Sequence, residues 1–357
     1  MSGTGAADAD SAPAFLRNLW YRAAQADTIR RGRLYRRIFL GEPVLLGRTH
    51  DGHPFGLRDI CPHRGVPLSA GRLLEENTVE CSYHGWRFRP EGTCAAIPSL
   101  VDGQDIDPSR IRVRSYPVRE QDGLIWIFMP APGQEFTQPA FDPPKVLLGG
   151  NARPQIVECQ RFRCAMDHAV VGLMDPAHGP FVHQAWYWRS RHSIHAKAKR
   201  FAPSLRGFTM VAHEPSSNSF AYRILGADVT TEIRFELPGV RFENISAGTK
   251  RIVGLTTCTP IDADATEVTQ VFYWNSALLG LIKPFFRPFA RAFLGQDRAM
   301  VELQREGLKF NPRLMLIPDA DVPAMWYQRL KKAWADSTGG NAAFVNPVPE
   351  TTLRWRS

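Results

Sequence analysis

The chain has 357 residues, of which 44% are hydrophobic and 22% charged, a balance typical of a globular protein with a substantial core. It contains no run of 18 apolar residues, which argues against a membrane-spanning helix, and its length allows about two domains. Residues 1–14 lack the basic and apolar segments of a secretory signal, so we expect a mobile N-terminal tail there.

The six cysteines are scattered along the chain and lack the dense spacing of a disulfide-stapled domain. Without a signal sequence, this pattern predicts a cytoplasmic, reducing environment. In such an environment cysteines spaced with histidines indicate metal binding before disulfides.

The net charge is +9, and the densest basic run lies at residues 28–37. Such a run is compatible with a solvated strand or loop, with docking of an acidic partner, or with nucleic acid. Nucleic acid is the least favoured, because the sequence contains no zinc-finger, RNA-recognition or helix-turn-helix signature.

Short strands separated by turns are expected in the first half of the chain, after an apolar segment at 15–21. Gly41 and the Asp51-Gly52 pair punctuate this region. The expected strands are residues 38–40, 43–47, 55–57, 78–81 and 124–128. This texture predicts a small all-β domain over residues 15–130.

Residues 131–154 are rich in proline and glycine and are expected to link this domain to a second one at 155–357. The segment 167–188 looks partly helical, with breaks at Pro176 and Gly179-Pro180. Strands are then expected at 207–211, 220–224, 228–236, 251–257 and 268–274, followed by a helix over 278–308. The predicted fold class is therefore α+β, with a central antiparallel sheet packed by helices in a helix-grip-like arrangement.

Two cysteine–histidine loops carry the first metal signature. Cys61-Pro62-His63 is followed, with seventeen residues between His63 and Cys81, by Cys81-Ser82-Tyr83-His84. In a Rieske centre two thiolates hold one iron of a [2Fe–2S] cluster and two imidazoles hold the other, so each loop must supply one of each. A Cys2His2 zinc site is the alternative, but zinc motifs usually keep cysteines and histidines in separate pairs.

A second signature follows in the other domain, where Asp175, His178 and His183 form a D-x2-H-x4-H pattern. Two imidazoles and a carboxylate on one face of a metal make the facial triad of non-haem iron(II) oxygenases. Two histidines five residues apart are by themselves weak evidence, and a surface pair is the commoner explanation. Their combination with the Rieske signature makes the iron site the stronger interpretation.

The chain resembles the catalytic (α) subunits of Rieske non-haem iron oxygenases, since CPHRG and CSYHGW are close to the two cluster loops of that family. The resemblance covers about residues 15–335. It implies that Cys61, His63, Cys81 and His84 bind the cluster and that His178 and His183 bind a mononuclear iron(II). It also implies that Asp175 is a catalytic carboxylate, which bridges His178 and a cluster histidine (His84) of the neighbouring subunit.

The third iron ligand is expected far downstream. The pattern D-x4-E-x-Q over residues 297–304 is similar to that of the vanillate demethylase-like monooxygenases of this family, which makes Asp297 the chosen carboxylate. Glu302 and Glu306 compete with it. One departure from the family pattern is Gly172, at a position where the family often has asparagine. Because of this difference, the substrate of no particular family member can be assigned to this chain.

The resemblance implies the terminal oxygenase component of a multicomponent system. It uses O2 and electrons from NAD(P)H, delivered by a reductase directly or through a ferredoxin, to hydroxylate or demethylate an aromatic or other apolar small molecule. A homotrimer is expected, without nucleic acid or membrane partners. Arginines near the cluster loops are candidates for docking an acidic ferredoxin: Arg64, Arg72, Arg87 and Arg89.

Three alternatives remain open at this stage. A ring cis-dihydroxylating dioxygenase uses the same two metal sites. A Rieske electron-transfer protein would have the cluster but no mononuclear iron site. A structural or regulatory zinc protein would have neither the iron–sulfur cluster nor the mononuclear iron site. Aromatic residues at 185–188 and 285–289 suggest an apolar pocket, although core packing explains each of them equally well.

Overall fold

The structure, a computed structural model, describes residues 15–134, 138–148, 152–183, 192, 194–215, 228–281, 283–339 and 343–357. The predicted tail, the aromatic residues at 185–188 and the expected strand at 220–224 lie outside these residues. No helix among the described residues combines the length and apolar character that a bilayer span requires.

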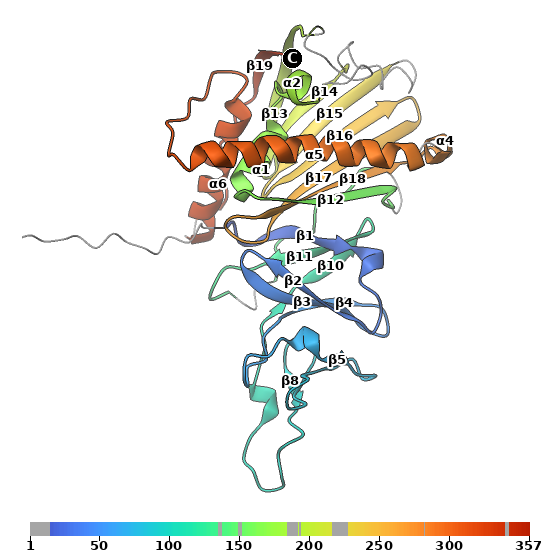
Figure 1. The fold of residues 1–357 in the computed structure, drawn as a ribbon, viewed down its shortest axis with the longest axis vertical. Coiled ribbons are helices and arrows are strands. Elements are labelled where there is room, and N and C mark those ends of the chain that lie inside the picture. The colour runs from blue at the N-terminus through green and yellow to red at the C-terminus, as the bar shows by residue number, and fades with distance from the viewer. Residues whose placement is uncertain are drawn as a thin grey trace, which may run out of the picture.

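The N-terminal part of the chain is an all-β domain that tapers away from the rest of the molecule (Figure 1). Its three antiparallel sheets have the strand orders β1-β11-β10, β2-β3-β4-β9 and β5-β6-β7-β8. The strands are β1 (Leu19–Gln25), β2 (Leu34–Phe39), β3 (Glu42–Arg48), β4 (Pro54–Arg58), β5 (Arg72–Leu73), β6 (Val79–Glu80), β7 (Arg87–Phe88), β8 (Cys94–Ala96), β9 (Ser115–Tyr116), β10 (Val118–Gln121) and β11 (Leu124–Met129). Short 3-10 turns occupy Ala26–Thr28, Leu68–Ala70 and Pro108–Arg110.

The C-terminal part is built on one eight-stranded antiparallel sheet with the order β12-β18-β17-β16-β15-β14-β13-β19. Its strands are β12 (Ile156–Phe162), β13 (Ala196–Ser204), β14 (Gly207–His213), β15 (Val229–Glu236), β16 (Val240–Ala247), β17 (Lys250–Pro260), β18 (Thr266–Trp274) and β19 (Thr351–Arg356). The helices are α1 (Met166–Met174), α2 (Gly179–Val182), α4 (Ala277–Leu281), α5 (Lys283–Leu308) and α6 (Val322–Gly339). The predicted α+β fold class is confirmed.

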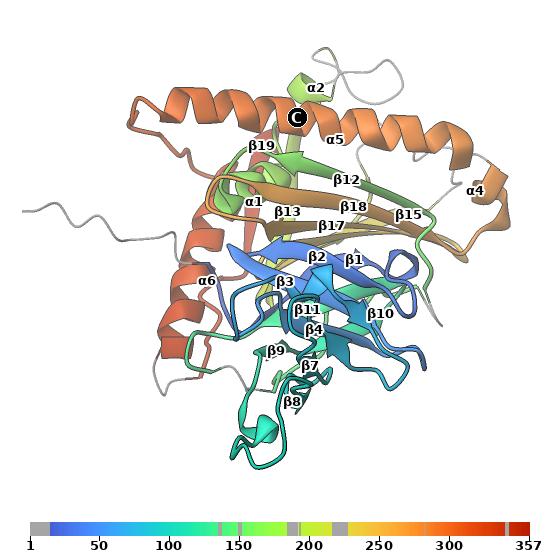
Figure 2. The same cartoon turned by 60° about the horizontal axis from the view of Figure 1, so that its bottom comes forward.

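The two faces of the large sheet have different partners. On one face, Phe242, Leu255 and Tyr273 form a buried cluster with Trp20 and Trp126 of the N-terminal domain. The long helix α5 lies on the other side, opposite β1 and β2 (Figure 2). Successive residues of a strand point to opposite faces, so each strand contributes one set of side chains to the domain contact and another set to the space under α5.

Hydrogen bonds and a buried ion-pair group join the two parts. Leu40 N–H donates to the Pro260 carbonyl (2.9 Å) at the end of β17. Glu267 on β18 accepts from Arg22 (3.0 Å) and from Arg37 (2.7 Å). Because Arg37 belongs to the basic run and is engaged within the chain, that part of the run has a structural partner instead of an external acidic one.

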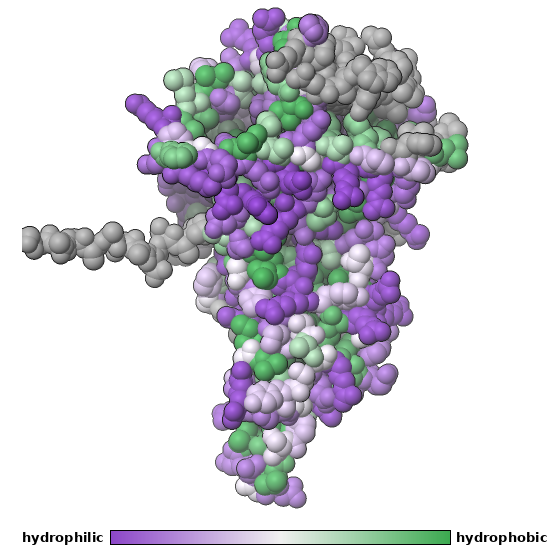
Figure 3. All heavy atoms as spheres, viewed as in Figure 1, coloured by the Kyte–Doolittle hydropathy of each residue, from purple (hydrophilic) through white to green (hydrophobic). Residues whose placement is uncertain are grey.

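An open, arginine-rich groove runs along this junction, where the surface is largely hydrophilic (Figure 3). It is lined by six arginines and two glutamates, Glu158 and Glu267, among other residues. The arginines are Arg22, Arg37, Arg161, Arg287, Arg291 and Arg298. Near the cluster loops, by contrast, Arg72, Arg87 and Arg89 each pair with a glutamate, which reduces the net charge available there to a partner.

The expected elements agree with the structure where the apolar pattern is strong. The predicted strands at 43–47, 124–128 and 268–274 lie within β3, β11 and β18, and the predicted helix at 278–308 corresponds to α4 and α5. The helices and strands not predicted are β1, β5, β7, β8, β9, β10, β12, β13, β16, β19 and α6. The described part of residues 131–154 contains no helix or strand, and the division of the chain at this segment stays a prediction.

Candidate metal centres

The two cysteine–histidine loops have the same backbone hydrogen bonds. Cys61 N–H donates to the Val66 carbonyl (2.9 Å), and Cys81 N–H donates to the Trp86 carbonyl (2.8 Å). Four residues after each cysteine, a glycine with a positive φ (+74° and +70°) returns a hydrogen bond to the cysteine carbonyl. Glycine adopts this conformation without strain, so the repeated spacing in sequence produces two equivalent turns.

These turns place the thiols inside and the imidazoles outside. Cys61 and Cys81 are 2% and 3% exposed, and burial, together with the neighbouring Cys81 thiol, raises the pKa of Cys61 to about 11. The ring centroids of His63 and His84 are 4.5 Å apart, and His63 stacks on Trp86 (4.8 Å). Two adjacent thiols beneath two adjacent imidazoles fit a [2Fe–2S] cluster whose outer iron is held by histidine.

The second site joins segments more than a hundred residues apart. Asp175, His178 and His183 lie at the ends of α1 and α2, and Asp297 lies on α5. The Nε2 atoms of His178 and His183 are 3.2 Å apart, and Asp297 Oδ1 lies 3.7 Å from the first and 3.0 Å from the second. Potential ligand atoms of these three residues all lie within 4.8 Å of one another, as a single metal ion requires.

The competing carboxylates point elsewhere. Glu302 accepts a hydrogen bond from the Arg163 backbone N–H (3.2 Å), and Glu306 pairs with Lys309 (2.6 Å). Among the three acids of this helix considered from sequence, Asp297 is therefore the one beside the imidazoles.

Both imidazoles are held so that Nε2 is available to a metal. His178 Nδ1 lies 2.9 Å from the Asp175 backbone carbonyl, and His183 Nδ1 lies 3.0 Å from Gln296 Oε1. Since both partners are acceptors, each Nδ1 carries the hydrogen and each Nε2 presents its lone pair. Phe293, one helical turn before Asp297, stacks on the His183 ring with centroids 3.6 Å apart.

Gln296 and Phe293 are the site residues that the sequence analysis missed. The sequence indicates them only by their position relative to Asp297. Gln296 is the residue before Asp297, and Phe293 lies four residues before Asp297, a spacing that places two residues on one face of a helix.

Asp175 is partly accessible and ionised. Burial alone would raise its pKa, but the neighbouring His178 and the hydrogen bond from the Ala177 backbone N–H outweigh this effect and lower it. Its Oδ1 accepts the Ala177 N–H (2.7 Å), and its Oδ2 lies 3.7 Å from His178 Nδ1, too far for a hydrogen bond. The carboxylate thus remains 34% exposed beside the iron ligand and is available to a further partner.

A cavity of about 200 Å³ opens on the imidazoles and Asp297 from the side of the sheet. Phe293 and Leu294 of α5 line it beside the iron ligands, and the strands β13 and β14 contribute both apolar and polar side chains. A second hollow of about 270 Å³ lies beside Asp175 and reaches Met300. Gly172 borders both, and a Cβ there would meet only Val301 Cγ2, at 3.5 Å, so the absent asparagine leaves open space.

Comparison with known proteins finds two family matches in separate parts of the chain. Residues 19–117 match the family "Rieske [2Fe-2S] domain", and residues 163–337 match "Vanillate O-demethylase oxygenase C-terminal domain". The chain is 38% identical over 177 residues to the oxygenase component of dicamba O-demethylase from Stenotrophomonas maltophilia, which covers 48% of each chain. It is 42% identical over 120 residues to the iron-sulfur subunit of a toluene-4-sulfonate monooxygenase system from Comamonas testosteroni, covering 34% of this chain and 33% of that one.

Solved structures share the whole architecture. Dicamba monooxygenase bound to dicamba superposes with a TM-score of 0.72 at 24% identity, covering 90% of this chain and 99% of the other. A Pseudomonas putida CBB5 NdmA variant with caffeine gives 0.71 at 17% identity, covering 94% and 97%. At these identities the likeness establishes the fold.

Together the fold, the two sites and the two domain matches define a Rieske-type oxygenase, and the predicted family is confirmed. More particularly, the chain belongs to the Rieske oxygenases whose catalytic domain is of the vanillate O-demethylase type. The aligned segments span only a third to a half of the length of the two relatives described above.

Proposed function

We propose that the protein is the terminal oxygenase component of a multicomponent system that hydroxylates or oxidatively demethylates an aromatic or other apolar small molecule. The observation that carries the proposal is the cluster of His178, His183 and Asp297 at the wall of a partly apolar cavity. The vanillate O-demethylase type of the catalytic domain favours monooxygenation or demethylation over ring dihydroxylation.

The residues fit the two groups that this function needs. Cys61, Cys81, His63 and His84 would hold the [2Fe–2S] cluster. His178, His183 and Asp297 would hold iron(II) and leave its remaining positions open toward the cavity. When bound, the cluster supplies single electrons and the mononuclear iron supplies the activation of dioxygen.

The chain contributes orientation, exclusion of water and a link between subunits. The Asp175 carbonyl and Gln296 fix the two imidazoles, and Phe293 covers the His183 ring on one side. The ionised, partly exposed Asp175 is placed to accept a hydrogen bond from a cluster histidine of a neighbouring subunit, so that it couples this histidine to His178.

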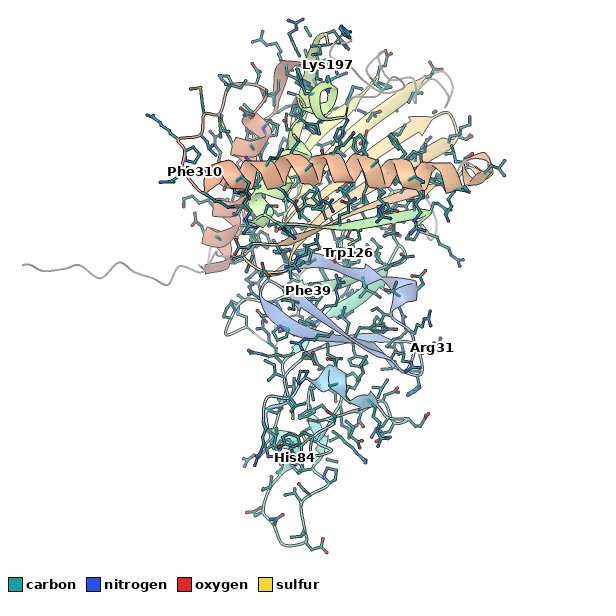
Figure 4. The ribbon with its side chains drawn as sticks, in the orientation of Figure 1. Arg31, Phe39, His84, Trp126, Lys197 and Phe310 are labelled. Carbon is teal, nitrogen blue, oxygen red and sulfur yellow. The ribbon has the colours of Figure 1, made fainter. Side chains whose placement is uncertain are left out.

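A homotrimer in head-to-tail arrangement is part of this proposal. Within one chain, His84 lies near the end of the tapering N-terminal domain, whereas α2, which precedes His183, lies at the opposite end of the molecule (Figures 1 and 4). The two sites of one chain therefore do not meet, and pairing across a subunit boundary brings them together.

Electrons would come from NAD(P)H through a separate reductase or ferredoxin. The basic character of the chain favours an acidic donor. None of the six cysteines forms a disulfide, which is consistent with the proposed cytoplasmic location.

Metal analysis of the protein purified under anaerobic conditions tests the two sites together. We expect about three irons and two acid-labile sulfides per chain, with the absorption and electron paramagnetic resonance spectra of a histidine-ligated cluster. Zinc-loaded, colourless protein would contradict the proposal.

The Asp297→Ala variant tests the third iron ligand. We expect the cluster spectra to be intact, the iron content to fall from about three to about two per chain, and turnover with dithionite-reduced protein and O2 to be lost. Glu302→Ala, on the same helix, is the matched control and should retain mononuclear iron. Full iron occupancy in Asp297→Ala would show that another carboxylate is the ligand.

A further inference from the structure

One amide on the wall of the cavity has a buried oxygen without a hydrogen-bond partner. Gln270 lies on β18 and lines the cavity that also reaches His178, His183 and Asp297. Among the described residues of this lining, Gln270 Oε1 is the one buried side-chain nitrogen or oxygen atom that has no partner. A buried amide oxygen without a donor costs free energy, because it has lost its bonds to water and gained none in exchange.

The alternation of side chains along β18 turns this amide toward α5. Val271 belongs to the buried cluster that packs against the N-terminal domain, so Val268, Gln270 and Phe272 lie on the opposite face of the sheet. The Phe272 ring contacts that of Phe286 in α5, with centroids 5.0 Å apart, and Val268 borders the second hollow described above. Gln270 is therefore a polar residue between two apolar ones, on a face that packing alone would make apolar.

The charged side chains of the same lining differ from Gln270, because they have partners within the chain. These pairs include Lys197 with Ser357 (2.8 Å), Lys199 with the Glu214 carbonyl (3.1 Å), His213 with the Val211 carbonyl (2.8 Å) and Arg241 with Glu243 (3.1 Å). A ligand that satisfies Gln270 Oε1 does so through a hydrogen bond to a neutral amide, and this bond requires no charge on the ligand.

The surroundings of the amide are those in which one hydrogen bond selects strongly. Phe201, Phe208, Phe235 and Phe293 line the same cavity. A hydrogen bond is stronger in such apolar surroundings than in water, and an unmade one is more costly. The volume of about 200 Å³ suits one substituted aromatic ring, so the ring that reaches the iron ligands also reaches Gln270.

We propose that Gln270 is a specificity-determining residue, whose side-chain oxygen accepts a hydrogen bond from a hydroxyl or N–H group on the ring of the substrate. The substrate is then a single-ring aromatic compound that carries such a donor in addition to the carbon that is oxidised. This inference rests on the proposed oxygenase function and assigns it a substrate class. Gln270 selects and orients the ring and takes no part in the oxidation itself.

A binding experiment with the iron-loaded, cluster-containing protein tests the inference. The ligands are the isomeric methoxyphenols and methoxyanilines, each compared by anaerobic isothermal titration calorimetry with the fluoroanisole of the same substitution pattern, in which fluorine replaces the donor. We expect the affinity ratio of at least one donor ligand to its fluoro counterpart to fall about tenfold in Gln270→Leu, because one hydrogen bond is lost. Gln270→Met, which keeps the length of the side chain, should give the same fall.

Thermal unfolding of the ligand-free protein gives a readout that separates selection from a structural role. Because the unpaired amide is costly in the folded state, we expect Gln270→Leu to raise the unfolding midpoint by about 2 °C. A structural amide would have the opposite effect. A midpoint that falls in both Gln270→Leu and Gln270→Met would show that the amide is engaged in the fold, and this result would overturn the inference.

Gln155→Leu is the matched control. Gln155 directly precedes β12 in the same sheet, lies outside the cavity, and donates its side-chain N–H to the Arg153 carbonyl (3.3 Å). This variant should keep the affinity ratio of the unchanged protein. Donor ligands that bind no better than their fluoro counterparts, or a ratio that is equal in the Gln270 variants and the unchanged protein, would also refute the proposed selection.

Product analysis after a single turnover distinguishes the failure of this inference from that of the proposed function. Release of formaldehyde from fluoroanisoles and methoxyphenols alike, with no effect of Gln270→Leu on their ratio, would refute the selection and leave the oxygenase function standing. Selective binding of a donor ligand without any oxygenated product, in protein with a reducible cluster and full iron, would refute the oxygenase function instead.

Discussion

Gln296 determines how the His183 ring is held, although it does not itself face the metal position. Its side-chain oxygen accepts the Nδ1 hydrogen at 3.0 Å. We expect Gln296→Leu to weaken iron(II) binding by about 10–100-fold, because such outer partners fix the tautomer and orientation of a ligand. Titration of iron into the cluster-containing protein measures this change. Gln296→Glu, which keeps an acceptor, should lose much less, and equal losses in both variants would argue against an orienting role.

Gly172 in α1 is a site where a side chain can be added without a clash. Glycine inside a helix is less favourable than alanine by about 0.5–1 kcal/mol, and a Cβ here meets only Val301 Cγ2 at ordinary contact distance. We expect Gly172→Ala to raise the free energy of unfolding by that amount, measured by thermal or denaturant unfolding. Gly92→Ala should do the opposite, because Gly92 has φ +91° and a Cβ there would lie 2.0 Å from the Val113 carbonyl oxygen.

The sequence alone identified the site residues that lie close to one another in the chain. Both cluster loops and the Asp175/His178/His183 segment lie within short motifs, so their spacing is visible without a structure. Asp297 needed a family resemblance, and Gln296 was not found. A glutamine on a helix has no distinguishing pattern until the fold brings it opposite an imidazole from a distant segment.

At the level of elements, the contact of β1 and β2 with β18 depends on Glu267. Burial raises its pKa, but Arg37 and Arg22 outweigh burial and lower it. A carboxyl whose pKa is lower in the folded state stabilises the fold above its unfolded pKa of about 4.3, and this stabilisation is lost as the pH falls toward the folded value.

We therefore expect Glu267→Gln to destabilise the protein by about 3 kcal/mol at pH 7, since it leaves Arg22 buried without its counter-charge. The difference from the unchanged protein should shrink below pH 4. Unfolding curves at pH 7, 5 and 3.5 measure it. Glu120→Gln, which removes an exposed partner of Arg48, should change stability by less than about 1 kcal/mol. A difference that does not vary with pH would exclude ionised Glu267 as the cause.

The strands that escaped prediction include two that line the cavity beside the iron site, β13 and β16, whereas β14, β15, β17 and β18, which also line it, were predicted. β13 presents Lys197 and Lys199 to the cavity, and β16 presents Arg241 and Glu243. A strand normally reveals itself by apolar residues on its buried face, and here that face is polar because it borders a binding cavity. β11, buried at all six of its residues, was predicted without difficulty.

For the whole molecule, the proposed head-to-tail trimer requires a surface that receives the neighbouring N-terminal domain. The hollow beside Asp175 is bordered by Met300 and by Ala320, and the segment between them exposes large apolar side chains. Phe310 and Met315 are each 85% exposed. Such a strip beside a partly exposed carboxylate is a suitable subunit contact.

We expect Met315→Asp to shift the protein from trimer to monomer in sedimentation or light-scattering measurements, and to reduce turnover while the cluster spectra stay unchanged. Leu205→Asp is the control, since Leu205 is 79% exposed and lies in the turn between β13 and β14, outside this strip. A Met315→Asp protein that stays trimeric would place the contact elsewhere.

The carboxylate ligand of the iron site, Asp297, belongs to α5, late in the sequence. The cluster loops, by contrast, lie in the sequence between β1 and β11, which pair with each other. During translation, all residues of the cluster domain are therefore synthesised long before Asp297 leaves the ribosome. Since N-terminal domains generally fold first during synthesis, cofactor insertion has a built-in order. We expect the iron–sulfur centre to be installable on a nascent chain that does not yet have a complete binding site for the mononuclear iron.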